Sequence, residues 1–229
     1  MQKLLSIIIP MYNGGGYIIK LINNIILLNK NILPKIQIII VDDGSTDNSY
    51  KLCSNFINDK AYIEIYTQQN QGIAGARNTS LKKSIGKYIT FCDQDDSLLL
   101  GYENFIQRME KETIDILISD PSISLNHVVK PMNRITIDEV VEKEKLKDLQ
   151  IYYIIDSTDT KHLLQNKFPP HTIWNTIYKR DIIVKYNIKF LAIVDYEDDW
   201  RFTTEYTCYA KKCLLAKKKF LCMDYKSFF

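Results

Sequence analysis

Short runs of β-branched residues alternate with amphipathic stretches along the first hundred residues of the chain. Ile7–Ile9 and Ile38–Val41 are uninterrupted runs of this kind, which is typical of strands that are buried on both faces of a sheet. Alternation of such strands with helical patterns indicates an α/β fold, with a mostly parallel central sheet flanked by helices. The elements expected from the pattern are, in order, Leu4–Ile9, Tyr17–Leu28, Ile36–Val41, Ser49–Asn58, Ile63–Thr67, Ala74–Ser84 and Tyr88–Cys92.

The pattern loosens after about Ile118. Residues 120–135 are rich in Pro, Ser and Asn, whereas residues 138–154 have the charge pattern of a helix and residues 219–225 resemble a strand. The chain has no internal repeat and no linker long enough to separate two folding units. We therefore expect a single compact domain over residues 1–229, in which the second half is the more variable.

Composition limits the classes of function. The 229 residues are 46% hydrophobic and 25% charged, as expected of a soluble globular chain that can bury a core. A net charge of +3, without basic runs that alternate with exposed aromatics, argues against a nucleic-acid partner. Five cysteines without C-x-x-C spacing argue against a disulfide framework and a structural zinc site, so a reducing cytoplasm is the expected compartment. The first apolar run ends at Pro10, too early for a signal peptide or a membrane span.

The C-terminal segment is locally basic. Tyr206, Tyr209, Cys213 and Leu214 recur there at roughly helical spacing. Two interpretations stay open, a solvated helix face packed on the core and peripheral contact with an anionic membrane surface. The basic residues of the segment are Lys211, Lys212, Lys217, Lys218, Lys219 and Lys226.

Carboxylates gather where the predicted strands end. Asp42 and Asp43 follow one buried strand, and Asp93, Asp95 and Asp96 follow another. Because ligands of open α/β sheets bind outside the carboxyl ends of the strands, we expect these turns to converge on one crevice. Acids packed this closely repel one another unless a hard cation such as Mg²⁺ or Mn²⁺ neutralises them, usually together with a substrate diphosphate. The alternative for either turn alone is a solvated acidic loop, or a helix cap with a spare acid.

Two further charged clusters suggest chemistry. Arg77 lies on the first turns of a predicted helix, where the helix dipole does not favour a cation, so it needs an anionic partner. That partner is either a diphosphate or a nearby carboxylate such as Asp95. Glu197, Asp198 and Asp199 precede an aromatic-rich helix, and three acids exceed what the dipole alone explains. One of them is a candidate general base.

These segments together resemble the inverting family 2 glycosyltransferases with the GT-A fold, the bacterial group that builds capsules, lipooligosaccharides and other surface glycans. The resemblance is nearly continuous over residues 4–105 and patchy over residues 170–205. It departs from the family at residues 14–16, three glycines that match no phosphate-binding loop and are interpreted as a flexible turn. The segments that carry it are SIIIPMYN from Ser6, VDDGSTDNS from Val41, NQG from Asn70, ARN from Ala76, GKYI from Gly86, DQDD from Asp93 and WN from Trp174.

The resemblance implies a donor site in the first half of the chain. Pro10 and Tyr12 would border the nucleotide base. Asp43 would accept a hydrogen bond from the edge of the base, with Asp42 beside it. Arg77 would lie near the diphosphate.

The resemblance also implies a metal site and a catalytic base. Asp93 and Asp95 match the D-x-D pair of the family, with Asp95 as the direct ligand of Mn²⁺ or Mg²⁺ and Asp93 as a second acid that leans toward the ribose. For the base, the acid-x-x-Phe spacing on Phe202 selects Asp199, whereas the Glu-Asp pair of the family selects Asp198. Both stay candidates, and we favour Asp199.

The implied activity is metal-dependent, inverting transfer of a sugar from a nucleoside-diphosphate sugar, with UDP as the expected nucleotide, to a glycan or lipid-linked acceptor in surface polysaccharide synthesis. Residues 1–120 would bind the nucleotide sugar and residues 121–229 would face the acceptor, in the cytoplasm or at the inner face of the membrane. The alternatives are a non-catalytic nucleotide-sugar-binding partner subunit and a nucleotidyltransferase, which would leave the acids at 197–199 without a role. An EF-hand calcium loop fails, because Leu98 and Asn104 stand where it needs Gly and Glu.

Overall fold

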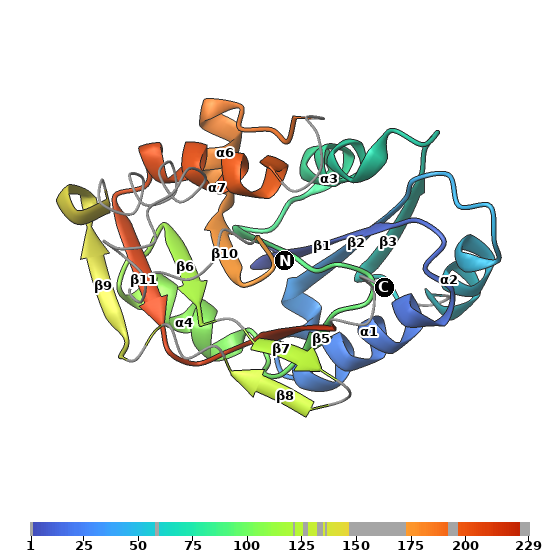
Figure 1. The fold of residues 1–229 in the computed structure, drawn as a ribbon, viewed down its shortest axis with the longest axis horizontal. Coiled ribbons are helices and arrows are strands. Elements are labelled where there is room, and N and C mark those ends of the chain that lie inside the picture. Colours follow the sequence, from blue (N-terminus) through green and yellow to red (C-terminus); the bar gives the residue numbers. More distant parts are fainter. Residues whose placement is uncertain are drawn as a thin grey trace.

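Two β-sheets organise the described part of the chain, one of eight strands and one of four (Figure 1). The computed structural model describes residues 2–57, 60–120, 122–125, 128–131, 135, 137–146, 173–191 and 197–224. The strands are β1 (Leu5–Met11), β2 (Ile36–Asp42), β3 (Ile63–Thr67), β4 (Tyr88–Phe91), β5 (Ser97–Leu98), β6 (Ile116–Ser119), β7 (Ser122–Leu125), β8 (Val128–Pro131), β9 (Glu139–Glu142), β10 (Thr176–Lys179), β11 (Lys212–Ala216) and β12 (Leu221–Asp224). The helices are α1 (Gly15–Leu28), the short 3-10 helix η1 (Leu33–Lys35), α2 (Ser49–Ile57), α3 (Gly72–Lys83), α4 (Glu103–Lys111), α6 (Arg180–Tyr186) and α7 (Glu197–Tyr209).

The central sheet confirms the predicted α/β class. Its strand order is β3-β2-β1-β4-β10-β6-β11-β9. Strands β3, β2, β1 and β4 are parallel, as are β6 and β11, whereas β10 is inserted antiparallel between β4 and β6 and β9 is antiparallel at the edge. The smaller sheet has the order β5-β12-β7-β8. Its strand β12 accounts for the strand predicted over residues 219–225.

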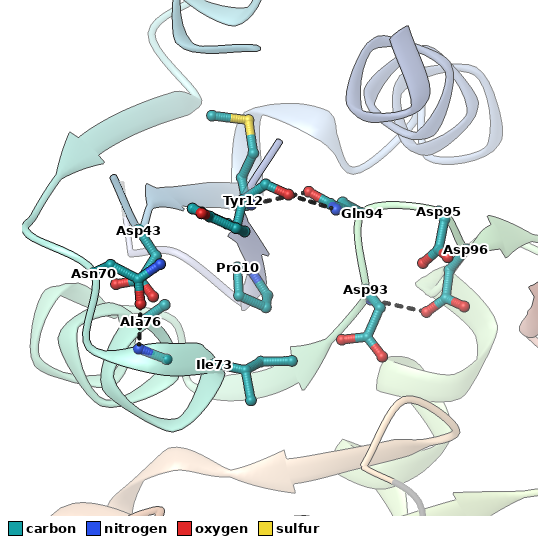
Figure 2. A pocket seen from close by; sticks show the side chains of 12 residues that line it. Pro10, Tyr12, Asp43, Asn70, Ile73, Ala76, Asp93, Gln94, Asp95 and Asp96 are labelled. Carbon is teal, nitrogen blue, oxygen red and sulfur yellow. Dashed lines mark hydrogen bonds between the residues drawn. The ribbon is translucent and has the colours of Figure 1, made fainter. Parts of the chain in front are cut away.

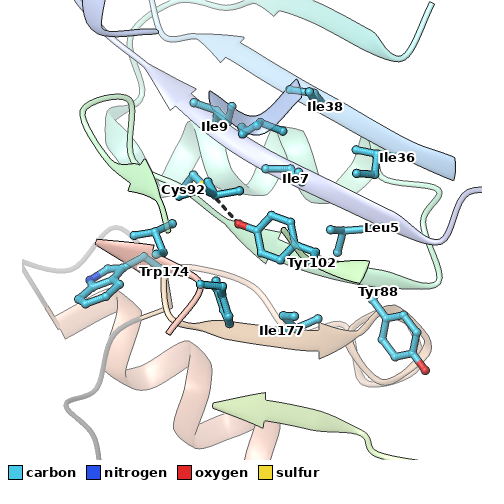
Figure 3. Close-up of a cluster of buried hydrophobic side chains, with 14 of the residues drawn as sticks. Leu5, Ile7, Ile9, Ile36, Ile38, Tyr88, Cys92, Tyr102, Trp174 and Ile177 are labelled. Atoms are coloured by element: carbon cyan, nitrogen blue, oxygen red, sulfur yellow. Dashed lines mark hydrogen bonds between the residues drawn. The ribbon is translucent and has the colours of Figure 1, made fainter. Parts of the chain in front are cut away.

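Helices cover both faces of the central sheet, because successive residues of a strand point to opposite sides. Ile7 and Ile9 of β1 share a buried cluster with Ile18 of α1 and with side chains of α2 and α4 (Figure 3). Ile8 belongs instead to a cluster that contains Phe202 of α7 and side chains of α3 and α6. The uninterrupted β-branched runs therefore pack against helices on both sides. Among the described residues, no helix has the length and apolar character needed to cross a membrane.

The carboxyl ends of β1, β2 and β4 lie next to one another. In the parallel register Met11 pairs with Asp42, and Ile8 pairs with Phe91. The segments that follow these three strands therefore emerge at one edge of the sheet, where ligands of such folds bind.

The prediction of a helix over residues 138–154 is wrong for the first residues of that range. Residues 139–142 form β9, which pairs with β11 and buries Val141 against the sheet. Only residues 143–146 are helical, and residues 147–154 lie outside the described residues. Pairing with an available strand edge overrides the helical charge pattern here.

The helical spacing read across the basic C-terminal segment is also wrong. Tyr206 and Tyr209 belong to α7, but Cys213 and Leu214 belong to β11 and are fully buried. Strand β11 has neighbours on both sides, so it needs apolar residues on both faces. The predicted turn at residues 14–16 differs as well, since α1 begins at Gly15.

Gly86→Ala is expected to lower the free energy of unfolding by about 3 kcal/mol. A Cβ at this position would lie 2.4 Å from the backbone nitrogen of Ser6 and 2.6 Å from the backbone carbon of Leu5, atoms of β1 that cannot move without shifting the sheet. Gly16→Ala is the matched control, because a Cβ there meets nothing within 4 Å and alanine favours a helix. Urea unfolding followed by circular dichroism measures both variants, and equal midpoints would contradict the prediction.

Candidate functional site

A cavity of about 380 Å³ opens at the carboxyl ends of β1, β2 and β4 (Figure 2). The turn after each strand and the beginning of α3 contribute to its wall. Of the residues predicted to bind the donor or a metal, Pro10, Tyr12, Asp43, Asp93 and Asp95 all lie on this wall. Among the described residues, the lining is Pro10, Met11, Tyr12, Asp43, Asn70, Gly72, Ile73, Ala76, Asp93, Gln94, Asp95 and Asp96.

The two adjacent acids after β2 have different surroundings. Asp42 does not belong to the cavity lining, and its Oδ1 accepts hydrogen bonds from the backbone N–H of Ser45 (3.1 Å) and from the Ser45 hydroxyl. Asp43 faces the cavity, and its Oδ1 accepts from Gln68 Nε2 (2.7 Å) and from the backbone N–H of Gln71 (2.9 Å). Asp42 therefore holds the turn, and Asp43 is the acid that a ligand can reach.

The loop after β1 is fixed from two sides. The Gln94 amide makes two hydrogen bonds to the backbone of Tyr12. Its Oε1 accepts from the Tyr12 N–H (3.1 Å) and its Nε2 donates to the Tyr12 carbonyl (3.0 Å). On the other side, Asn13 N–H donates to Ser45 Oγ (3.0 Å), and Asn13 Oδ1 accepts from the backbone N–H of Thr46 (2.9 Å). Asn13 has a φ of 50°, a left-handed conformation that asparagine tolerates better than most residues. The Tyr12 side chain, 45% exposed, is thus presented at the cavity by a rigid backbone.

The acid turn after β4 gathers three carboxylates. Asp96 is buried, and its Oδ2 accepts from the backbone N–H of Asp93 (2.8 Å). Burial, followed by the nearby charge of Asp93, raises the pKa of Asp96 well above its ordinary value. Asp93 and Asp95 are half-buried and face the cavity. The turn therefore places three carboxyl groups on one side of the cavity.

These residues fit a divalent cation that is shared with a ligand. Mg²⁺ is usually bound by one or two carboxylates, while waters and substrate phosphates complete its coordination. In the described ranges, no group of three or more acidic, histidine or cysteine side chains could hold a metal ion by itself. Asp95 and Asp93 can supply the carboxylates. Behind them, Oδ1 of buried Asp96 has no hydrogen-bond partner among the described residues, and a bound cation or its waters would satisfy this buried polar atom.

Arg77 connects the cavity to the second acidic cluster. The residue is 2% exposed. Its Nη1 donates to Asp199 Oδ1 at 2.6 Å, and its Nη2 donates to Asp93 Oδ1 at 3.1 Å. The anionic partner expected from the sequence is thus present as carboxylates, but they are Asp93 and Asp199 rather than Asp95. Asp199 lies outside the cavity lining and is joined to it through this guanidinium.

The beginning of α7 is packed against α3. Asn78 Nδ2 donates to the Phe190 carbonyl (2.8 Å), and the Phe190 N–H donates to Asn78 Oδ1 (2.9 Å). The Phe190 ring stacks on Phe202 of α7 with centroids 4.2 Å apart, and the Arg77 guanidinium lies 5.3 Å from the Phe190 centroid, within cation–π range. These contacts set the position of Asp199. The side chain of Asp198 lies outside the described residues, so the choice between the two acids stays a prediction.

Arg77→Met is expected to lower the free energy of unfolding by about 3 kcal/mol, because it leaves two partly buried carboxylates without their cation. Urea unfolding at pH 7 measures the loss. Arg201→Met, at an exposed position of α7, is the matched control and is expected to change little. Equal midpoints for the two variants would show that the guanidinium does not carry this stability.

Sequence patterns did not reveal the amide side chains of the site. Gln68 holds Asp43, Gln94 holds Tyr12, and Asn78 holds Phe190. Each joins segments whose proximity depends on the fold. Only their positions in the sequence could have drawn attention to these residues, because Gln94 stands between two candidate acids and Asn78 follows Arg77.

Comparison with known proteins gives one family. The model described as Glycosyl transferase family 2 matches residues 6–186. The uncharacterized glycosyltransferase YibD of Escherichia coli (strain K12) is 29% identical over 196 residues, which cover 85% of this chain and 54% of that protein. The chain spans about half the length of curated relatives such as this one and EpsJ of Bacillus subtilis.

Solved structures with a similar fold carry nucleotide sugars. S. aureus TarS 1–349, in complex with UDP-GlcNAc, matches with a TM-score of 0.78 at 19% identity, over 97% of this chain and 59% of that one. The mannosyltransferase PcManGT from Pyrobaculum calidifontis, in complex with GDP-Man and Mn²⁺, matches with a TM-score of 0.65 at 14% identity, over 95% of this chain and 56% of that one. At such identities the likeness establishes a shared fold.

Proposed function

The chain belongs to glycosyl transferase family 2, and from this membership we propose that it transfers a sugar, with inversion, from a UDP-sugar to a hydroxyl of a glycan or lipid-linked acceptor in surface polysaccharide synthesis. One observation carries the proposal. Asp43, Asp93 and Asp95 follow two different strands, yet all three face a single cavity. A nucleoside-diphosphate sugar needs such an arrangement, with polar acceptors at the base and a cation site at the diphosphate.

The base-binding side is formed by the turns after β1 and β2. Pro10 and Tyr12 provide apolar surface to border the base. Asp43 Oδ1 is already held by Gln68 and Gln71. Its second oxygen has acceptor capacity left, which suits the imide N–H of uracil.

The diphosphate side is formed by the acid turn. Asp95, with Asp93, would hold Mg²⁺ or Mn²⁺, which when bound supplies Lewis-acid stabilisation of the charge on the departing nucleoside diphosphate. Arg77 lies beside Asp93 through its 3.1 Å ion pair, so its positive charge stays close to the same leaving group.

The reaction is a single in-line displacement. The acceptor oxygen forms a bond to the anomeric carbon while the bond from that carbon to the diphosphate oxygen breaks. The hydroxyl proton passes to Asp199, or to Asp198 if that acid lies closer to the acceptor. The Arg77 guanidinium holds the Asp199 carboxylate in place through the 2.6 Å contact between Nη1 and Oδ1.

The two halves of the chain have different tasks in this proposal. Residues 1–120 provide all the lining residues found in the described part of the chain and would bind the donor, and residues 121–229 would face the acceptor. Contact with an anionic membrane at the inner face of the cytoplasmic membrane would use exposed lysines. Lys211, Lys217 and Lys218 are exposed, whereas Lys212 and Lys219 are engaged in ion pairs within the described structure.

Calorimetry of the full chain with UDP, GDP and dTDP, each with Mn²⁺ and again with EDTA, tests the donor site. We expect UDP to bind, and to bind more tightly with Mn²⁺ than with EDTA. Sugar release is then measured with a panel of UDP-sugars, and NMR assigns the anomeric configuration of the product. Nucleotide binding without sugar release or transfer would favour a non-catalytic partner subunit. Absence of nucleotide binding would overturn the proposal.

A further inference from the structure

The glycines at residues 14–16 have no part in the proposed reaction, and only the first has a close neighbour. A Cβ on Gly14 would lie 2.4 Å from Oε1 of Gln94, whereas a Cβ on Gly15 or Gly16 would meet nothing within 4 Å. Gly14 has a φ of −80° and a ψ of −15°, a conformation open to any residue. An alanine here would therefore have to displace the Gln94 amide from its present place.

The Gln94 amide joins the two sides of the cavity. It stands between Asp93 and Asp95 on the acid turn, and both of its polar atoms bond to the backbone of Tyr12 on the base-binding loop (Figure 2). Asn13 ties the same loop to the turn that carries Asp43. Among the described residues, Gln94 is thus the side chain that connects this loop to the acid turn.

A nucleoside diphosphate would touch both sides at once, the base near Tyr12 and the phosphates near Asp95. Its affinity depends on whether the distance between these two sides is already fixed in the free protein, because ordering the loop and the turn on binding costs conformational entropy and lowers the affinity. A side chain with two hydrogen bonds can set that distance, whereas water in its place cannot.

We propose that Gln94 is a positioning residue that holds the acid turn at a fixed distance from the base-binding loop, and that Gly14 is required because its missing side chain leaves room for the Gln94 amide. The inference rests on the proposed function, since it assumes a ligand that spans both sides. It predicts that Gly14 and Gln94 act as one unit, although they are 80 positions apart in the sequence.

A double-mutant cycle tests this unit by calorimetry with UDP and Mn²⁺. Gln94→Ala and Gly14→Ala are each expected to weaken UDP binding about tenfold, the equivalent of two modest hydrogen bonds. The double variant is expected to bind UDP no more weakly than either single variant, because both substitutions remove the same pair of hydrogen bonds between Gln94 and Tyr12. Gly16→Ala is the matched control in the same glycine run and is expected to bind like the wild type. Gln94→Glu, which puts an acceptor against the Tyr12 carbonyl, is expected to bind at least as weakly as Gln94→Ala.

A second probe separates positioning from general loosening of the loop. Uridine, followed by ligand-observed NMR, touches only the base side, so its affinity should change less than about twofold in Gln94→Ala. Equal losses for uridine and UDP, additive effects of the two substitutions, or unchanged UDP binding would each overturn the inference. If the wild-type chain binds no nucleotide, the proposed function fails and this inference falls with it, whereas wild-type binding that Gln94→Ala leaves intact overturns the inference alone.

Discussion

Asp95→Asn is expected to lower the rate of sugar transfer by about a thousandfold, with the fold intact. Asp95 lines the cavity and is half-buried, and asparagine keeps its size while removing its charge. Electrostatic stabilisation by a bound divalent cation contributes several kcal/mol in the transition state, and about 4 kcal/mol corresponds to a factor of a thousand. The variant should also lose the part of its UDP affinity that depends on Mn²⁺.

Two measurements on the same protein preparations check this result. Transfer from a UDP-sugar gives the rate, and calorimetric titration of UDP with and without Mn²⁺ gives the metal-dependent part of the affinity. Asp181→Asn, at an exposed acid in the first turn of α6, is the matched control. Metal-dependent UDP binding at wild-type strength in Asp95→Asn would remove Asp95 from the metal site and leave Asp93 as the acid to test.

Asp199→Asn is expected to lower transfer by roughly a thousandfold through loss of the general base, within the usual range for such groups. UDP affinity should stay within about twofold, because Asp199 lies outside the cavity lining. The rate and the affinity are measured as for Asp95→Asn. A matching loss of both would indicate a role in donor binding in place of proton transfer.

Asp199→Asn also removes an ion pair with Arg77, so stability has to be measured alongside the rate. Urea unfolding of Asp199→Asn and Arg77→Met shows how much each variant loses from the broken 2.6 Å contact. Asp198→Asn is the deciding comparison, because Asp198 stands at the neighbouring position of α7. If Asp198→Asn shows the larger fall in rate, the base is Asp198 and Asp199 serves to hold Arg77.

The strands and helices predicted over residues 4–92 match the structure to within two residues at each end, whereas η1, β5, α4 and β6 were not predicted. Parallel strands between two layers of helices need apolar side chains on both faces, so β1 and β2 appear as runs of isoleucine. The acids at the strand ends were predictable for a related reason. Carboxylates are unfavourable inside the sheet, so Asp43 and Asp93 mark the points where the chain leaves it.

The second half could not be predicted to the same degree. Val140 and Val141 lie in a stretch rich in Glu and Lys, and they form a strand only because the edge of β11 is free to pair with them. Residues 213–216 are a short buried run, and the spacing of apolar residues in so short a run does not distinguish a helix from a strand. The hydrogen bonds of the Gln94 and Asn78 amides could not be predicted from the sequence, because their partners are brought close only by the completed fold.

The insertion of β10 has a consequence for how the chain can be synthesised and divided. Strand β10 fills the position between β4 and β6, and it is translated more than fifty residues after either of them. Until Lys179 has been synthesised, β4 has an unpaired edge and β6 has neither of its neighbours, since β11 is made later still. Such unpaired edges are sites for chain association. A fragment cut near residue 120 would lack β10 and β11 permanently, so residues 1–120 are expected to associate or misfold when they are made alone.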